Sequence, residues 1–106
     1  MLYLLSIWPK EKTERFEVVD MRESALESKL VRAVRQKGGK CWKWSSPGTA
    51  GVPDRICLFP GGRAIFVELK APGGQPRPLQ RKRHEELRGL GFEVLVIDTE
   101  AGIDAI

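Results

Sequence analysis

Two short runs of strand-forming residues, 55–59 and 64–70, are separated by the tripeptide Pro60-Gly61-Gly62. Proline followed by glycine favours a tight reversal of the chain, so the two runs are predicted to pair as an antiparallel hairpin. Side chains alternate between the two faces of a strand, which places Glu68 and Lys70 on the same face. The hairpin therefore holds a carboxylate and an amine one pleat apart.

The remaining elements are predicted from hydrophobic periodicity. Leu26, Leu30 and Val34 recur every four residues, which is typical of one face of a helix. The predicted elements are helices over 22–37 and 78–89, strands over 40–45, 55–59, 64–70 and 92–97, and a short helix within 101–106. This order predicts an α/β fold in which a small mixed β-sheet is flanked by helices.

The second predicted helix is expected to turn Leu79, Leu87 and Leu90 toward the core. His84 lies on a neighbouring stripe of the same helix, and we expect it to be structural. The strand over 92–97 is apolar except for Glu93 and is predicted to be buried.

Composition bounds the class of protein. The chain has 106 residues, which fits one domain, and its net charge of +4 is compatible with a phosphate-bearing partner without requiring one. Cys41 and Cys57 form no CxxC pair and only one histidine is present, which argues against a zinc site. We expect both cysteines to be reduced core residues. Neither a secretory signal nor a membrane span is predicted, so the cytoplasm is the expected compartment.

Residues 1–20 differ from the rest, because an apolar stretch over 1–8 is followed by a run of charged residues. We therefore divide the chain into an N-terminal extension, 1–20, and a domain, 21–106. The extension is predicted to be an added strand or a flexible tail, with an arm that packs on a second subunit as the alternative.

Three carboxylates, Glu27, Asp54 and Glu68, form the candidate metal site. Oxygen donors without imidazole or thiolate suit Mg²⁺ or Mn²⁺. Glu27 falls on the apolar stripe of the first helix, where a carboxylate is costly unless it is paired. Glu23 is expected in the first turn of that helix, where the helix dipole alone favours an acid. The plainer alternatives are a solvated Glu27, a turn role for Asp54, and a surface pair of Glu68 with Lys70.

Three segments resemble a known family: Gly51-Val52-Pro53-Asp54, Glu68-Leu69-Lys70, and Gln80 at the start of the second helix. Following an acidic first helix, they resemble the PD-(D/E)XK nuclease superfamily and, more narrowly, the VRR-NUC (virus-type replication-repair nuclease) family. The resemblance covers about residues 22–99, and it departs from the pattern at Leu69, where valine is usual. It implies a PD-(D/E)XK restriction-endonuclease-like core, in which residues 1–20 have no counterpart.

The resemblance also implies roles for individual residues. The implied metal ligands are the side chains of Glu27, Asp54 and Glu68 and the carbonyl of Leu69. Lys70 would position or activate the attacking water, and Gln80 would hydrogen-bond near Lys70 and the phosphate. The implied reaction is hydrolysis of a DNA phosphodiester with Mg²⁺, which Mn²⁺ can replace. The implied catalytic residues are Asp54, Glu68, Lys70 and Gln80.

DNA contacts are predicted on two segments flanking these motifs. They are the polar loop residues Ser45, Ser46, Gly48 and Thr49, and the basic residues Arg77, Arg81 and Lys82. A basic face can neutralise phosphates, although a merely solvated helix face is the alternative. Trp42 and Trp44 are expected in the core or at a subunit interface, with stacking on opened bases as the alternative.

A chain of this size covers little DNA, and we find no helix-turn-helix or zinc finger, which favours cleavage directed by DNA structure. Stand-alone members of the family are small, often viral, and resemble Holliday-junction resolvases. Two symmetric cuts suit a C2 homodimer, whose contact surface is predicted at residues 2–8 and Trp42 or Trp44. A viral chain would act in the host cytoplasm. The alternatives are a flap- or end-directed repair nuclease that needs a protein partner, and a non-catalytic nucleic-acid-binding module.

Overall fold

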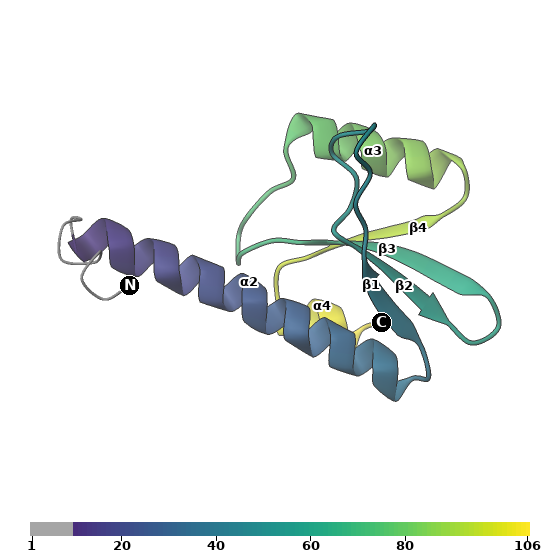
Figure 1. Cartoon of the computed structure of the whole chain (residues 1–106), viewed down its shortest axis with the longest axis horizontal. Coiled ribbons are helices and arrows are strands. Elements are labelled where there is room, and N and C mark those ends of the chain that lie inside the picture. The colour runs from purple at the N-terminus through teal and green to yellow at the C-terminus, as the bar shows by residue number, and fades with distance from the viewer. Residues whose placement is uncertain (1–9) are drawn as a thin grey trace.

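The computed structural model describes residues 10–106, with side chains described from Arg22 onward. Three helices pack on one sheet: α2 (Lys10–Gln36), α3 (Pro78–Gly89) and α4 (Glu100–Asp104). Helices α2 and α4 cover one face of the sheet and α3 covers the other (Figure 1). The predicted small mixed α/β fold is therefore confirmed. Within residues 10–106, no helix is long and apolar enough to cross a membrane.

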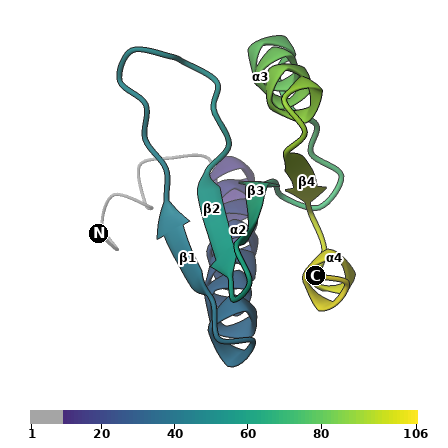
Figure 2. The ribbon, with the colours of Figure 1, turned by 90° about the vertical axis from the view of Figure 1, so that its right-hand side faces the viewer.

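The sheet contains β1 (Lys40–Lys43), β2 (Arg55–Phe59), β3 (Arg63–Leu69) and β4 (Glu93–Ile97), in that spatial order. Strands β1, β2 and β3 are antiparallel, whereas β4 runs parallel to β3. The predicted hairpin is confirmed, and Gly62 N donates to the carbonyl of Phe59 at 3.2 Å across its turn. Helix α3 is the crossover that returns the chain to a parallel strand. A long loop between β1 and β2 rises on the same side of the sheet as α3 (Figure 2).

The hydrophobic core lies between α2, α4 and the sheet. The buried members of this cluster are Leu26, Leu30, Val34, Cys57, Ile65, Val67, Leu69, Ile97 and Ile103. Cys57 belongs to the core and Cys41 lies at its edge, and both are free thiols. Strand β3 is central, so its odd-numbered side chains face α2 while Phe66 and Glu68 face α3. Glu68 is only 1% exposed, which makes the alternative of a surface pair with Lys70 wrong.

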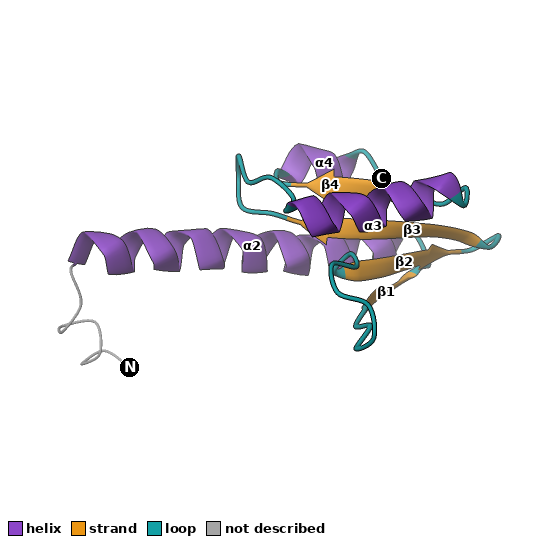
Figure 3. Cartoon of the chain, turned by 90° about the horizontal axis from the view of Figure 1, so that it is seen from above, coloured by secondary structure: helices purple, strands orange, loops and turns teal. Residues whose placement is uncertain are grey.

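Helix α2 begins at Lys10, twelve residues before the predicted start at residue 22. Its sequence from Lys10 to Gln36 contains neither glycine nor proline and is rich in lysine, glutamate and arginine, which favour helix without an apolar stripe. The N-terminal half of α2 extends beyond the sheet (Figure 3). The predicted division at residue 20 thus falls inside a helix. The predicted contact surface at residues 2–8 lies outside the described residues.

Helix α3 has the predicted bounds, but its inner face differs from the prediction. Leu79 and Leu90 are 42% and 75% exposed, whereas His84 is buried. The reason is that α3 covers Glu68, so the stripe that carries His84 faces the sheet instead of the leucine stripe. Strand β4 is an edge strand, and Val96 in it remains 38% exposed.

Candidate active site

Glu68 lies at the end of β3 beneath α3 and is the centre of the candidate site. Its Oε2 accepts a hydrogen bond from Gln80 Nε2 at 3.4 Å and lies 3.9 Å from Lys70 Nζ. Its Oε1 lies 3.5 Å from His84 Nε2. Helix α3 and the residue just after β3 thus converge on one buried carboxylate.

Gln80 joins this carboxylate to the lysine. Its Oε1 accepts hydrogen bonds from Lys70 Nζ at 3.0 Å and from Arg77 N at 2.8 Å. The second contact satisfies one of the free N–H groups at the start of α3, so Gln80 caps its own helix. The backbone of Lys70 is fixed by its N–H, which donates to Ile97 O at 2.9 Å. The predicted proximity of Glu68, Lys70 and Gln80 is therefore present in the structure.

Asp54 reaches the same site from the start of β2. Its Oδ2 accepts from Leu69 N at 2.8 Å, and its own carbonyl accepts from Trp44 N at 2.9 Å. Arg55 pairs with Val67 in the β2–β3 ladder, so Asp54 lies opposite Glu68. Asp54 is consequently tied to the strand that carries the second carboxylate.

The loop before Asp54 is held against the start of α3. Arg83 Nε donates to Ala50 O at 2.8 Å. Gly51 has φ +88°, and a Cβ there would lie 2.9 Å from Leu79 Cγ. Only glycine fits both this conformation and this close approach, which explains the glycine of the G-x-P-D motif.

Burial and charge oppose ionisation of Glu68. Burial, together with the adjacent Asp54 carboxyl, raises the pKa of Glu68 to about 8. Lys70 lowers this pKa and the carboxylate of Glu23 raises it further. Burial lowers the pKa of His84, and Arg88 and Lys70 add to that effect. A neutral carboxyl is thus favoured beside a neutral imidazole.

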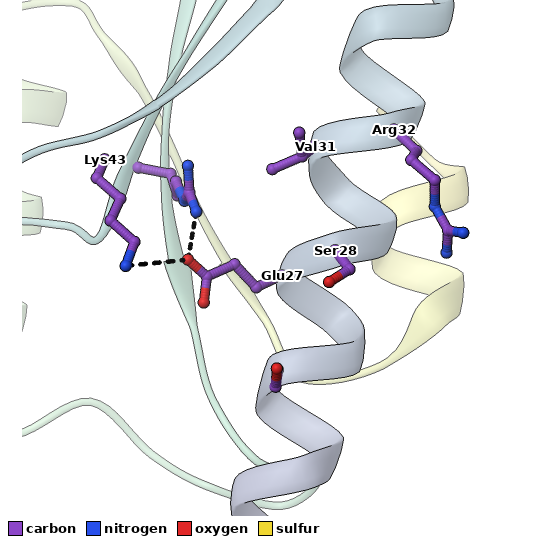
Figure 4. Close-up of a pocket in the computed structure, with 7 residues that line it drawn as sticks. Glu27, Ser28, Val31, Arg32 and Lys43 are labelled. Atoms are coloured by element: carbon purple, nitrogen blue, oxygen red, sulfur yellow. Dashed lines mark hydrogen bonds and ion pairs between the residues drawn. The ribbon is translucent and has the colours of Figure 1, made fainter.

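Two glutamates of α2 approach the site differently. Glu27 forms an ion pair with Arg55 Nη2 and lies 4.0 Å from Lys43 Nζ (Figure 4). Arg55 also donates to Cys41 O at 3.2 Å, which fixes the pair against β1. Glu23 accepts a hydrogen bond from Ala71 N at 3.0 Å, just beyond Lys70. Glu23 therefore lies beside the end of β3, whereas Glu27 is engaged by cations of β1 and β2.

Two neighbouring cavities open along this side of α2, and Glu27 and Lys43 line both. One of about 360 Å³ contacts the candidate site, and it is lined by Glu23, Glu27, Lys43, Trp44, Ser45, Asp54 and Leu69. The other, of about 380 Å³, is lined by Ser24, Glu27, Ser28, Val31, Arg32, Lys43 and Arg55 (Figure 4). Only the first cavity reaches both Asp54 and Leu69.

Whether these residues fit a metal ion depends on their donors. Among the described residues, no three His, Cys, Asp or Glu side chains form a preassembled metal cluster. The carboxylates instead accept bonds from the chain itself. However, Glu68 Oε1 is buried with no hydrogen-bond partner in the described structure, and the nearby acids, Asp54 and Glu23, offer further carboxylate oxygens. This hard, all-oxygen set fits Mg²⁺ or Mn²⁺.

The predicted DNA-contacting residues lie on both sides of the site. Ser45 lines the cavity, and Thr49 N donates to Ser46 O at 3.0 Å in an exposed turn that includes Gly48. The predicted cations Arg77, Arg81 and Lys82 are all exposed, on α3 and just before it. The loop and the start of α3 are the two segments that rise above the sheet (Figure 2).

The tryptophans have different environments. Trp44 packs on Phe66 with ring centroids 5.0 Å apart, which matches the expected core role. Trp42 is 57% exposed on β1, so it lies outside the core of the monomer.

Comparison with known proteins identifies the family. The model of the VRR-NUC domain matches residues 3–101. The chain belongs to the VRR-NUC family. This VRR-NUC match starts earlier than the resemblance read from the motifs, which began at about residue 22.

Two relatives support the same assignment. The chain is 48% identical over 80 residues to "Putative nuclease p44" of Acyrthosiphon pisum secondary endosymbiont phage 1, covering 76% of this chain and 86% of that protein. A solved VRR_NUC domain superimposes with a TM-score of 0.76 at 29% identity, covering 79% of this chain and 91% of the other. The fold and sequence therefore place this VRR-NUC chain among nucleases, which act on nucleic acid.

Two residues that lie beside the VRR-NUC motifs were not among the predicted site residues. Glu23 was discounted because the helix was expected to begin beside it, and His84 because a lone histidine near an apolar face is commonly structural. The signal for Glu23 was its position four residues before Glu27, on the same side of the helix. The signal for His84 was its position four residues after Gln80.

Proposed function

We propose that this VRR-NUC chain is a metal-dependent, structure-selective endonuclease that hydrolyses phosphodiester bonds in DNA. The observation that supports it is the convergence of Asp54, Glu68, Lys70 and Gln80 at the end of one strand. A non-catalytic binding module would have no need to bury Glu68 at 1% exposure beside a second carboxyl.

In this proposal Asp54, Glu68 and the carbonyl of Leu69 hold Mg²⁺ or Mn²⁺. Glu23 supplies the carboxylate of α2, because it lies at the end of β3 while Glu27 is engaged by Arg55 and Lys43. When bound, the metal ion neutralises charge on the phosphate and makes water more acidic.

The remaining side chains position the substrate and the attacking water. Lys70 lies beside Glu68, and Gln80 fixes its Nζ through a 3.0 Å hydrogen bond. From there Lys70 orients the water or holds a phosphate oxygen as a point charge. The loop around Ser46 and the cations at the start of α3 bind the DNA backbone on either side.

For the substrate we propose a four-way junction that is cut by a C2 homodimer. The small chain offers few elements for reading a base sequence, and a dimer brings two equivalent sites to one junction. The exposed Trp42 on the edge strand β1 is the described residue proposed for the subunit contact.

The test is a panel of labelled DNA substrates: single strand, duplex, 5′ flap, 3′ flap and four-way junction. Each is incubated with Mg²⁺, Mn²⁺ or EDTA, and the Asp54→Ala variant serves as the matched inactive control. Paired, metal-dependent nicks in the junction are expected. Cuts confined to flaps would replace the junction by a flap-directed repair activity. DNA binding without cleavage in either metal would refute the proposed catalysis.

A further inference from the structure

Helix α3 presents two polar side chains to the carboxyl group of Glu68, one helical turn apart. Gln80 and His84 are four residues apart and so share one side of the helix. Gln80 Nε2 donates to Oε2 of Glu68 at 3.4 Å, and His84 Nε2 lies 3.5 Å from Oε1. Each oxygen of the carboxyl group therefore faces a different residue on the same side of α3.

The contact on Oε1 is isolated from other polar groups. The side chains of Glu68 and His84 are 1% and 2% exposed. In the described structure neither Oε1 of Glu68 nor Nε2 of His84 forms a hydrogen bond, and the two atoms face each other at 3.5 Å. A buried donor and a buried acceptor are costly when each stands alone, and a hydrogen bond between these two atoms, which need to approach only slightly, would remove that cost.

The chemistry of a neutral imidazole fits this arrangement. Such a ring carries one N–H, and with the proton on Nε2 it donates to Oε1. A carboxylate oxygen has two lone pairs, so a donor on one leaves the second for a cation. Hydrogen-bond donors that hold a metal-binding carboxylate from the side away from the metal fix the orientation of the carboxylate.

We propose that His84 is a positioning residue of the nuclease site: its Nε2–H holds Oε1 of Glu68 while Gln80 holds Oε2. Together they fix the plane of the carboxyl group that lies opposite Asp54 across the β2–β3 ladder. This inference rests on the proposed function, because it assigns His84 a role in the same site. A histidine that only fills space beneath α3 would need no particular nitrogen at this position.

Two variants of His84 separate positioning from packing. His84→Gln places an amide N–H near the position of Nε2, whereas His84→Leu keeps an apolar side chain without a donor. Leu87→Ala, one turn further along α3, is the matched control for loss of packing. Cleavage of the preferred DNA is measured over a range of DNA and Mg²⁺ concentrations.

We expect His84→Leu to lower kcat about 10- to 100-fold and to raise the Mg²⁺ concentration for half-maximal rate. The KM for DNA should stay within about threefold, since His84 is buried away from the DNA surface. His84→Gln should restore kcat to within about fivefold of the wild type, and Leu87→Ala should leave kcat unchanged. Equal loss in both His84 variants, or loss in neither, would overturn the proposal.

A second measurement tests the contact without any cleavage. The unfolding equilibrium constant is measured in EDTA for His84→Leu, for Glu68→Met and for the double variant. The effect of His84→Leu should differ by more than about threefold between the two backgrounds, since residues in contact are coupled. The combination of Leu87→Ala with Glu68→Met should be additive. Additivity of His84→Leu with Glu68→Met would overturn the inference, whereas a wild type that cuts no DNA would refute only the proposed function.

Discussion

Replacing Glu68 by glutamine should stabilise the metal-free protein at pH 8 while abolishing cleavage. Burial and Asp54 raise the pKa of Glu68 from its ordinary 4.5 to about 8. Between these two values the folded protein keeps a proton that the unfolded chain has released. The free energy of unfolding must therefore fall as the pH rises through this window, and the contribution is fully present only below about pH 4.5.

The size of the effect follows from the pKa shift. Each pH unit within the window costs about 1.4 kcal/mol for one group, which gives an upper limit of about 3 kcal/mol by pH 7. The pKa of about 8 already includes the opposing effect of Lys70, so we expect a loss of up to about 3 kcal/mol by pH 7. Glutamine keeps the shape of a protonated glutamate, and its amide can donate to Asp54 without ionising. In the Glu68→Gln variant the free energy of unfolding should therefore not fall with rising pH through this window.

The assay is urea unfolding at pH 5, 6, 7 and 8 in EDTA, for the wild type and Glu68→Gln. An exposed acid of α3, replaced in the Glu85→Gln variant, is the control for a change of net charge alone. Parallel pH profiles of the wild type and Glu68→Gln would refute the buried-carboxyl argument. Added Mg²⁺ should stabilise the wild type more at pH 8 than at pH 6, because a cation favours the ionised form of Glu68.

Three further predictions concern the other residues of the site. Asp54→Ala should abolish cleavage while DNA affinity stays within a few-fold, and a gel-shift assay that shows equal loss of both would count against the site. Glu23→Gln should lower the cleavage rate at least about 10-fold. Glu27→Gln should mainly lower the urea midpoint of unfolding, because Arg55 loses its ion-pair partner. The opposite pattern would identify Glu27, not Glu23, as the metal ligand. Replacing the cations at the start of α3 by alanine should weaken binding to all DNA sequences alike. It should also reduce the slope of log K against log salt concentration by up to about three units. An unchanged slope would show that this face does not contact phosphates. The cations are Arg77, Arg81 and Lys82.

Local chemistry was sufficient to predict most of the fold. The Pro60-Gly61 turn specifies the β2–β3 hairpin, and the bounds of α3 follow from Pro78 and the glycines near its end. The start of α2 was missed because the prediction relied on an apolar stripe, which begins near Leu26. Upstream the helix extends past the sheet, and among the described residues no layer lies there that would require a stripe (Figure 3).

The part of the site that lies on the β2–β3 hairpin was predictable, because short turns determine the register of the two strands. The proximity of Asp54, Glu68 and Lys70 follows from strand register, which short turns determine. The sequence predicts Glu27 as the metal ligand of α2, whereas our proposal assigns Glu23, because the residue nearest the site depends on where α2 crosses the end of β3. That crossing is set by tertiary packing and carries no local signal.

The inner face of α3 was mispredicted for a reason that concerns the chemistry. A helix that covers a sheet normally turns its leucines inward, yet here Leu90 is 75% exposed and His84 is buried. The sheet position beneath α3 is Glu68, on the central strand, where a hydrophobic residue would best stabilise the fold. The proposed catalysis requires an acid at that position, and the helix above it must then supply donors in place of leucines. The polar stripe of α3 is therefore a consequence of burying a carboxyl group, which is why sequence rules based on apolar periodicity fail at the site and succeed elsewhere in this chain.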